Sequence, residues 1–376
     1  MHNPVFEILL YWVIPVAAVI TVIVFFHELG HYLVGRLCGV RIETFSIGFG
    51  REIAGITDRK GTRWKIGWLP IGGYVRFFGD LDVASRPDRE GGQAMSAEER
   101  SAALQFKPLW QRALVVAAGP FANFVLAIAF FMVPLLILGR VLIEPLIGSV
   151  TPGSPADRAG IRAGDIVRQI DSTNISDFGQ IPEIVQTGGG QPLIITLQRG
   201  NQRIAVRVIP KLMQRNELGS TETVPFLGIG SDPKKAKLTV VSYGPLGAFK
   251  EAAHETWQVI VDSGKGLAQL VTGRAGSRQL HGTASIVVMT GHVAQLGIFP
   301  LIQLIAFLSV SIGLINLFPI PVLDGGHLLY YACEAVLGRP LGERAQEIGF
   351  RVGLALILGL VLFSFWNDLA HHLNLF

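Results

Sequence analysis

The stretch HELGH at residues 27–31 contains the residue types and spacing most specific for chemistry in this sequence. Residues four apart share one face of a helix, so His27 and His31 can direct both imidazoles at one metal ion. Glu28 is turned by about 100° from His27, where it can reach a water on the metal but not the metal itself. This spacing is typical of two zinc ligands with a carboxylate general base. The motif therefore predicts a zinc centre with Glu28 as its base.

A catalytic zinc needs a third protein ligand and keeps one coordination position open. The candidate is Asp324, which ends the run NLFPIPVLD and is followed by Gly325 and Gly326. The two prolines of that run break a helix, and the glycines let the backbone approach closely. An Asp before Gly-Gly is also typical of a plain turn, so these residues alone leave both interpretations open.

The composition indicates the elements that must position these side chains. The chain has 376 residues, 50% of them hydrophobic and only 16% charged, with a mean hydropathy of +0.45. Such a chain is too apolar for an ordinary soluble globule and suits a membrane protein. About 20 apolar residues cross a bilayer, and four windows qualify or nearly so: 8–26, 113–138, 298–318 and 349–366. We expect no nucleic-acid partner.

The basic residues between the first two windows predict the orientation. Residues 35–112 carry many Lys and Arg, and the positive-inside rule places such a loop in the cytoplasm. The long segment after the second window is then outside, as are both termini. On this topology the first span runs inward and ends at His27, and the third span also runs inward. Asp324 is therefore expected at the same depth as HELGH, which favours the ligand interpretation.

Residues 44–50 and 65–79, which follow HELGH, are rich in glycine and aromatic side chains and alternate as strands do. They predict a β-hairpin. A substrate helix must unwind to be cut, and its freed backbone groups then need partners, which the edge of a hairpin can supply by strand addition. We expect Gly48, Gly72 and Gly73 to lie where a substrate binds. A plain cytoplasmic hairpin is the alternative.

Three motifs in order resemble the site-2 protease family of intramembrane zinc metalloproteases, and most closely its bacterial RseP-like members with a PDZ domain. They are HELGH, the run GPFAN at residues 119–123 and the run NLFPIPVLDGG at residues 316–326. The resemblance implies one Zn²⁺ per chain, held by His27, His31 and Asp324, with Glu28 as base. It also implies that Asn316 contacts or positions the unwound substrate backbone, and that Asn123, grouped with the substrate-binding residues, is a polar element of the second span near the active site.

Residues 144–212 form short β-rich runs with one helical piece and resemble a circularly permuted bacterial PDZ domain. The resemblance implies a peptide groove lined by the loop residues Leu146, Ile147 and Gly148, with free backbone N–H groups for a C-terminal carboxylate. Binding of termini and steric exclusion of bulky substrates both remain open. Residues 213–295 are expected to be a connector with an amphipathic helix at 245–271, lying on the outer membrane surface or packed on the rest of the protein.

The predicted fold is therefore a polytopic α-helical membrane protein of about four spans, with a re-entrant β-hairpin and an inserted α+β PDZ domain. Its membrane core comprises residues 1–143 and 296–376. The family implies an intramembrane endopeptidase of the bacterial inner membrane, with the zinc site near the cytoplasmic side and the PDZ domain in the periplasm. The expected substrates are single-span proteins that an outside protease has already trimmed, such as anti-sigma factors or remnant signal peptides.

Two other functions would use parts of this sequence. A PDZ scaffold without enzymatic activity would use the metal structurally, but structural zinc sites are usually closed by four protein ligands. A zinc transporter would need polar residues along several spans, whereas here the ionisable groups collect at one depth. The residues favour the protease.

Overall fold

The computed structural model describes residues 9–80, 95–217, 220–232, 236–271 and 283–372. The chain divides into two compact units. The first unit combines residues 1–133, 249–268 and 280–376, and the second combines residues 134–248 and 269–279. The first unit contains the HELGH motif.

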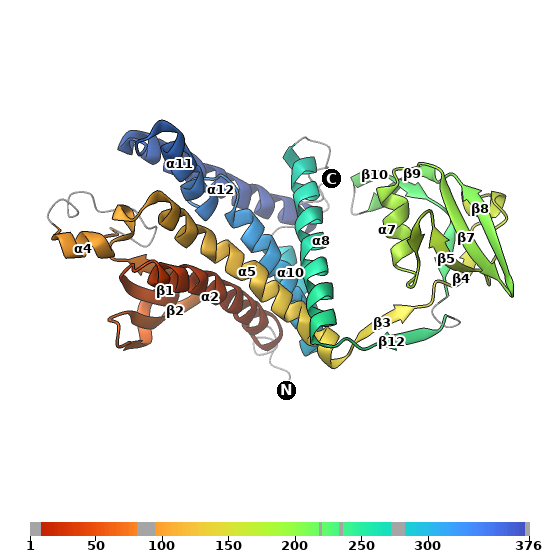
Figure 1. The fold of residues 1–376 in the computed structure, drawn as a ribbon, viewed down its shortest axis with the longest axis horizontal. Helices are drawn as coiled ribbons and strands as arrows, with labels where there is room; N and C mark the ends of the chain where they lie inside the picture. The colour runs from red at the N-terminus through yellow and green to blue at the C-terminus, as the bar shows by residue number, and fades with distance from the viewer. Residues whose placement is uncertain (1–8, 81–94, 218–219, 233–235, 272–282, 373–376) are drawn as a thin grey trace. The chain divides into compact units, whose positions relative to one another are not determined.

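Four helices of the first unit are long and apolar enough to cross a membrane. They are α2 (Ile14–Leu37, preceded by the π-helical turn η1, Leu9–Val13), α5 (Leu109–Ile137), α10 (Ile298–Asn316) and α12 (Glu343–His372). Figure 1 shows α2 and α5 side by side. All four predicted spans are thus confirmed as helices. Two shorter helices join them: α9 (Thr283–Gln295) and α11 (Asp324–Leu337).

The first span is longer than the sequence indicates, and the prediction that it ends at His27 is wrong. Helix α2 continues for ten residues beyond His27, to Leu37. The residues after HELGH remain mostly apolar, and Tyr32 is buried in a core with Phe45 of the hairpin and Val115 of α5. The helix ends where Gly39 takes a positive φ of 69°, the usual left-handed end of a helix. HELGH therefore lies near the middle of the span.

Small residues let the spans approach one another closely. A Cβ at Gly30 of α2 would overlap the carbonyl oxygen of Ala118 and lie 2.8 Å from the Cβ of Ala122, both on α5. A Cβ at Gly313 of α10 would lie 3.1 Å from the Cβ of Asn123 on α5. Close packing of this kind replaces the hydrophobic driving force that is absent between helices in lipid. Helix α5 is thereby held between α2 and α10.

The expected hairpin is confirmed as strands β1 (Ile42–Thr57) and β2 (Arg63–Phe77). Both strands bend and pair twice: residues 44–47 pair with 73–76 on one side and with 63–66 on the other. Gly48 and Gly72 lie at the bends with φ of 82° and 95°, a backbone region that glycine adopts without steric cost. The outer edge of residues 73–77 pairs with no other strand among the described residues.

The turn between α10 and α11 is strained and tightly packed. Val322 has a φ of 106°, which is rare for a β-branched residue and is kept only where the surroundings enforce it. A Cβ at Gly325 would overlap the carbonyl of Phe318, and one at Gly326 would lie 2.5 Å from the carbonyl oxygen of Ile320. The expected close approach of the backbone at both glycines is confirmed. This turn fixes the start of α11, where Asp324 is the first residue.

A bidentate ion pair holds α11 against α5. The Nη1 and Nη2 atoms of Arg112 donate to the two carboxylate oxygens of Glu334 at 3.0 and 2.5 Å, and both side chains are mostly buried. The guanidinium also lies 5.0 Å from the ring centroid of Tyr331. Planar paired contacts of this type fix orientation as well as distance. They orient the helix that begins with Asp324.

Helix α8 (Pro245–Val271) has two different faces. Ala248, Ala252 and Thr256 recur at helical spacing and are buried, whereas Leu246 and Trp257 are largely exposed. The helix is thus amphipathic, as predicted. Its position on a membrane surface stays a prediction.

The second unit is a small β-rich domain. Its four-stranded antiparallel sheet has the order β6-β5-β7-β8, which confirms the expected β-rich character of this segment. The elements are β4 (Ile147–Val150), β5 (Ile166–Ile170), β6 (Thr173–Asn174), β7 (Leu193–Arg199) and β8 (Gln202–Val208), with helices α6 (Pro155–Arg158) and α7 (Gln180–Thr187).

The core of this domain extends past residue 212, where the sequence predicts its end. Strand β11 (Ile229–Ser231) pairs with β4, and Leu227 is buried in the same core as Ile147 and Val167. The other strands form two ladders: β9 (Lys211–Glu217) with β10 (Ser220–Phe226), and β3 (Arg140–Ile143) with β12 (Leu238–Val241).

One buried charge pair stabilises the small domain. Asp165, 1% exposed, accepts hydrogen bonds from Nε and Nη2 of Arg199, both at 2.7 Å, and from the backbone N–H of Arg162 at 2.8 Å. Burial raises the pKa of Asp165, but these hydrogen bonds lower it by more, so its pKa lies below the ordinary value. The ionised carboxylate therefore stabilises the fold.

We predict that Asp165→Asn destabilises the small domain by about 1.5–3 kcal/mol, the usual worth of hydrogen bonds to a charged group. A carboxyl with a lowered pKa stabilises the fold fully above its unfolded pKa of about 3.9 and loses this contribution as the pH falls through the folded pKa. Hydrogen exchange of β5 and β7 in the full chain should be faster in the variant at neutral pH, and the difference should shrink in acid. Arg207→Gln, an exposed charge on β8, is the control, and equal exchange in Asp165→Asn and wild type contradicts the prediction.

Candidate metal centre

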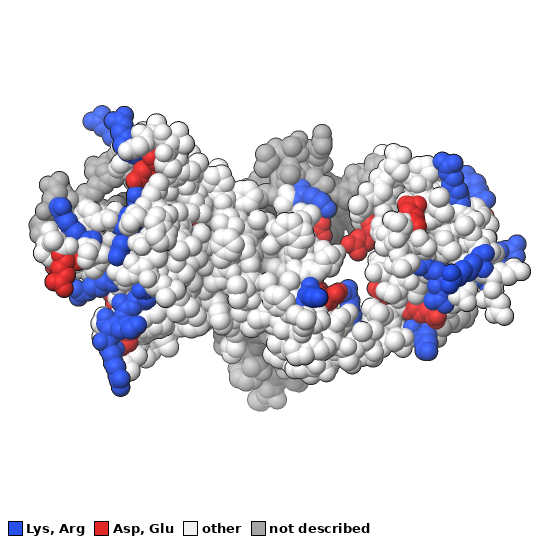
Figure 2. Space-filling model, viewed as in Figure 1, with Lys and Arg blue, Asp and Glu red and all other residues white. Residues whose placement is uncertain are grey.

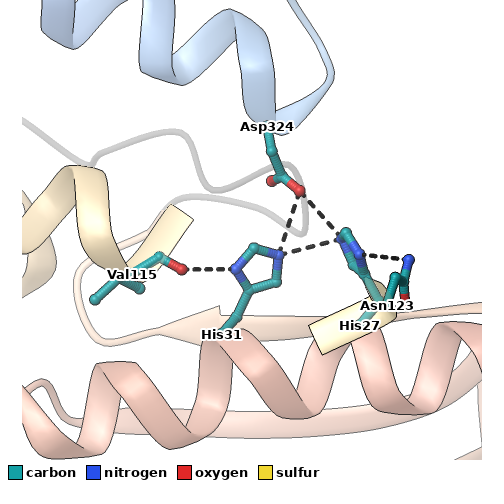
Figure 3. Close-up of polar contacts among 5 residues, drawn as sticks. All are labelled: His27, His31, Val115, Asn123 and Asp324. Carbon is teal, nitrogen blue, oxygen red and sulfur yellow. Dashed lines mark hydrogen bonds and ion pairs between the residues drawn. The ribbon is translucent and has the colours of Figure 1, made fainter. Parts of the chain in front are cut away.

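Three potential metal ligands from distant parts of the chain meet in the first unit. His27 and His31 lie one turn apart on α2, and Asp324 is the first residue of α11. Figure 3 shows the carboxylate pointing down between the two imidazole rings. The three ligand atoms lie within 4.8 Å of one another, and they form the one such group found among the described residues. The expected trio is thus brought together as the topology predicts.

The distances fit a tetrahedral zinc ion. His27 Nε2 lies 3.1 Å and His31 Nε2 lies 3.5 Å from Oδ2 of Asp324, and the two Nε2 atoms are 3.2 Å apart. Ligands about 2.0–2.1 Å from a tetrahedral zinc are roughly 3.3–3.4 Å from each other. Oδ2 of Asp324 is buried and has no hydrogen-bond partner among the described residues. Two imidazole nitrogens and an unpartnered carboxylate oxygen are a donor set suited to zinc.

The hydrogen bond to Val115 prepares His31 to bind a metal. Nδ1 of His31 lies 2.9 Å from the carbonyl oxygen of Val115 on α5, a group that can only accept. Nδ1 therefore carries the proton, and Nε2 presents a lone pair toward Asp324 and His27. A hydrogen-bond acceptor at the ring nitrogen that does not bind the metal fixes both the tautomer and the ring orientation of a metal-binding histidine.

Asn123 of α5 plays the same part for His27. Its amide lies 3.3 Å from Nδ1 of His27, and the residue is fully buried. An amide N–H pointing at Nδ1 would leave the proton on Nε2, where it opposes metal binding. Turning the amide by half a rotation brings Oδ1 to the ring, where it accepts the Nδ1–H bond. Metal binding therefore selects the orientation with Oδ1 at His27.

Glu28 is separate from the three ligands, as a base must be. It is not in the group of close ligand atoms, but it interacts electrostatically with His27, His31 and Asp324. A Cβ on Gly73 of β2 would lie 3.5 Å from Cγ of Glu28 and 2.7 Å from the carbonyl oxygen of Ser46. The glycine thus leaves room for the Glu28 side chain beside the hairpin.

Gly119 is part of the site, a role that the sequence does not reveal. A Cβ there would overlap Nε2 of His31 and lie 2.5 and 2.9 Å from the Cε1 atoms of His31 and His27. Any side chain at this position would fill the space between the imidazoles. The motif GPFAN signals that α5 approaches the site, but only the packing shows that its first residue must lack a side chain.

Comparison with known proteins agrees with this geometry. The model of peptidase family M50 matches residues 15–360. A protein of Agrobacterium fabrum named as a zinc metalloprotease is 44% identical over 360 residues, covering 96% of each chain. Metalloprotease MmpA of Caulobacter vibrioides is 40% identical over 378 residues, covering 93% of each chain. The chain belongs to peptidase family M50. It is accordingly a zinc metalloprotease with several membrane spans.

A comparison of folds adds one further likeness. The PDZ domain of the SdrC-like protein from Listeria monocytogenes aligns with 23% of this chain and 84% of its own, at 17% identity and a TM-score of 0.20. A likeness at this level carries no structural argument. The assignment of the small domain to the PDZ class therefore stays a prediction.

The remaining residues expected at the site lie in different surroundings. Asn316 ends α10, is half-buried and has no hydrogen-bond partner for its amide among the described residues. Gly48 and Gly72 lie at the bends of the hairpin. A Cβ at Gly48 would lie 2.6 Å from the carbonyl oxygen of Leu69, and a Cβ at Gly72 would lie 2.5 Å from the ring of Phe49. Asn123 is fully buried and contacts His27, so it lies near the active site as expected, and its part in binding a substrate stays a prediction.

The expected peptide groove of the small domain is also corrected. The backbone N–H groups of Leu146 and Ile147 donate to the carbonyls of Glu144 and Asp165, and the Ile147 side chain is fully buried. Gly148 lies in strand β4 rather than in a loop, so this segment offers no free loop for a carboxylate. An apolar hollow of about 480 Å³ lies elsewhere, between α7 and the segment 224–229. It is lined by Ile181, Val185, Met213, Val224, Phe226 and other residues.

We predict that Gly119→Ala abolishes zinc binding, because its methyl group occupies the space between the two imidazoles. Metal analysis of the purified protein should give close to one zinc per wild-type chain and almost none in the variant. Gly264→Ala on α8, where an added Cβ meets nothing within 4 Å, is the matched control and should keep its zinc. A Gly119→Ala protein with full zinc content would contradict this geometry.

Asn123→Leu should weaken zinc binding by about 10–100-fold, the usual effect of removing a partner behind a metal ligand. Asn123→Asp keeps an acceptor oxygen at Nδ1 of His27 and should retain zinc better than Asn123→Leu. Competition with a chelator of known affinity measures the difference. Equal affinities for Asn123→Leu and wild type would show that the amide does not orient His27.

Proposed function

We propose that this M50 protease is an intramembrane endopeptidase that cleaves within the membrane segments of single-span proteins. The observation that carries the proposal is the ligand trio with Glu28 beside it, near the middle of an apolar helix. His27 is ten residues from Leu37, or about 15 Å along the helix. The hydrocarbon core of a bilayer is about 30 Å thick. If Leu37 lies at one edge of that core, His27 lies near its middle, so the zinc meets the scissile bond inside the bilayer.

Each residue has a part in hydrolysis. Zinc, when bound by His27, His31 and Asp324, supplies a Lewis acid that makes water nucleophilic near neutral pH. Glu28 accepts the proton of the attacking water and returns it to the leaving amine. The free amide of Asn316 donates to the substrate backbone near the scissile bond. One zinc per chain suffices, since one ligand group is found among the described residues.

The hairpin receives the unwound substrate. A membrane helix that is opened for cleavage exposes N–H and C=O groups that lipid cannot satisfy. Residues 73–77 of β2 have an unpaired edge among the described strands, and Gly73 lies against Glu28. A substrate strand added at this edge keeps its backbone hydrogen-bonded while its peptide bond faces the zinc.

The orientation and the partners follow from the distribution of charge and from the family. The loop before α5 is basic and lies on the cytoplasmic side of a bacterial inner membrane. The small domain lies in the periplasm, where it acts as a PDZ module. The zinc site lies between the two surfaces. The substrates are single-span proteins already trimmed on the outside, such as anti-sigma factors or remnant signal peptides.

The protease is preferred over a scaffold with a structural metal because of the ligand count. Among the described residues three side chains, not four, converge on the site, and a carboxylate lies beside them. A structural zinc is usually closed by four protein ligands, whereas three ligands leave a position for water and substrate.

We expect Glu28→Gln to retain zinc but to lose cleavage by at least about 10²–10⁴-fold, the usual contribution of a positioned base. Asp324→Asn should lose zinc and cleavage together. Both are compared with wild type on a tagged single-span substrate co-expressed in membranes, with zinc measured on the purified proteins. Cleavage by Glu28→Gln at the wild-type rate would remove Glu28 as the base, and equal cleavage by all three would assign the cut to another protease.

A further inference from the structure

A basic hollow lies at the end of the first span and has no part in the proposed cleavage. Its volume is about 360 Å³, and it is lined by Arg36, Gly39, Val40, Arg41, Lys60 and Ala102. Three of these six residues are cationic. A fourth cation is close by, since a Cβ on Gly39 would lie 3.4 Å from Nζ of Lys107. Segments from α2, the turn between β1 and β2, and the end of α4 (Ala97–Ala102) build it.

These cations are not neutralised within the described part of the chain. Among the described residues no ion pair is found for Arg36, Arg41, Lys60 or Lys107, although Arg41 lies close enough to Glu99 for its charge to lower the pKa of that carboxyl. Nη2 of Arg36 is shielded from solvent and has no hydrogen-bond partner among the described residues. Shielding a charged donor without a partner costs free energy, which an anion bound to the guanidinium offsets.

Two carboxylates beside the hollow, Asp58 and Glu99, are occupied by other donors. Asp58 accepts hydrogen bonds from the backbone N–H groups of Lys60 and Thr62, at 2.8 and 2.9 Å, and from Nε1 of Trp64 and the Tyr32 hydroxyl. Glu99 accepts from the backbone N–H of Ser96, at 2.8 Å, in the cap of α4. Four cations thus face two carboxylates that are already engaged, and the hollow keeps a positive excess.

Capping of α2 does not account for the cations. Basic side chains often satisfy the last carbonyls of a helix. Here the backbone N–H groups of Cys38, Gly39 and Val40 donate to the carbonyls of Val34, Arg36 and Gly35. The guanidinium groups of Arg36 and Arg41 lie over the rings of Tyr32 and Phe78, 5.9 and 4.9 Å from the ring centroids. Such contacts use the flat face of a guanidinium, so its N–H edge can bind a tetrahedral oxyanion, whose oxygens match the forked donors.

The neighbourhood of the hollow favours a lipid as the source of that oxyanion. Leu33 and Leu37 lie one turn apart on α2, are 51% and 86% exposed, and lead directly to the hollow. Figure 2 shows Lys and Arg gathered at the end of the first unit that carries α4 and the β1–β2 hairpin, while the surface over α2 and α5 is almost uncharged. An acyl chain on the leucines would bring its phosphate to the cations.

We propose that this hollow binds the phosphate of an anionic phospholipid headgroup at the membrane surface, with an acyl chain lying over Leu33 and Leu37. The bound lipid would hold the end of α2 at a fixed depth. Since α2 carries His27, Glu28 and His31, the lipid would set the depth of the metal centre as well.

Native mass spectrometry of the detergent-solubilised full chain, titrated with a short-chain phosphatidylglycerol, tests the proposal. Each basic residue near a phosphate contributes about a fivefold gain in affinity, so Arg41→Gln/Lys60→Gln should bind about 25-fold more weakly. Lys60→Arg keeps the charge and should bind like wild type. Arg59→Gln removes an exposed charge of the same turn that does not line the hollow, and it should change the affinity less than twofold. Phosphatidylcholine, whose headgroup carries no net charge, should bind more weakly than phosphatidylglycerol.

Two outcomes overturn the proposal. If Arg59→Gln weakens lipid binding about fivefold, as much per charge removed as Arg41→Gln/Lys60→Gln, the effect is one of net charge and the hollow is not a site. If millimolar inorganic phosphate displaces the lipid from wild type and itself binds in a manner that needs Arg41 and Lys60, the hollow is a site for a soluble phosphate. Retained zinc in each variant verifies that the fold is intact.

Discussion

The burial of two imidazoles and a carboxylate among apolar helices is the constraint on which the rest of the first unit depends. Polar groups at that depth are costly unless each has a partner. Val115 and Asn123, both on α5, form hydrogen bonds with the Nδ1 atoms of His31 and His27, which point away from Asp324. The two Nε2 atoms and the carboxylate of Asp324 are then available to bind a metal. Helix α5 contributes no ligand, yet it sets the tautomers of two of them.

Close packing makes that arrangement possible. Helix α5 can reach the imidazoles only because Gly30 and Gly119 have no side chain where α2 and α5 touch. The strained turn at Val322 and the Arg112–Glu334 pair fix the start and the direction of α11, so that Asp324 meets the rings from the other side. Strain of this kind persists where surrounding contacts enforce it, as is common at functional sites.

In the proposed function the hairpin gives the substrate access to the centre. Its glycines let the strands bend and let β2 lie against Glu28, which places an unpaired strand edge beside the base. A membrane protease needs such an edge, because an unwound substrate has no water to satisfy its backbone. The basic hollow lies at the cytoplasmic end of the same α2 helix in the proposed orientation. The candidate metal centre, the strand edge proposed for the substrate and the hollow proposed for a lipid thus all lie on or beside α2.

The sequence by itself predicted the three side chains that converge in the structure, the four helices and the hairpin, because helical spacing and long apolar runs are local signals. The role of Glu28 as base stays a prediction. It also predicted that Asp324 joins His27, since topology alone places two inward spans at one depth. Only the tertiary structure decided that α2 continues to Leu37, that Gly119 must lack a side chain and that Leu146 and Ile147 serve a sheet. These features depend on contacts between residues far apart in the chain, and no local pattern encodes the space that a distant neighbour leaves.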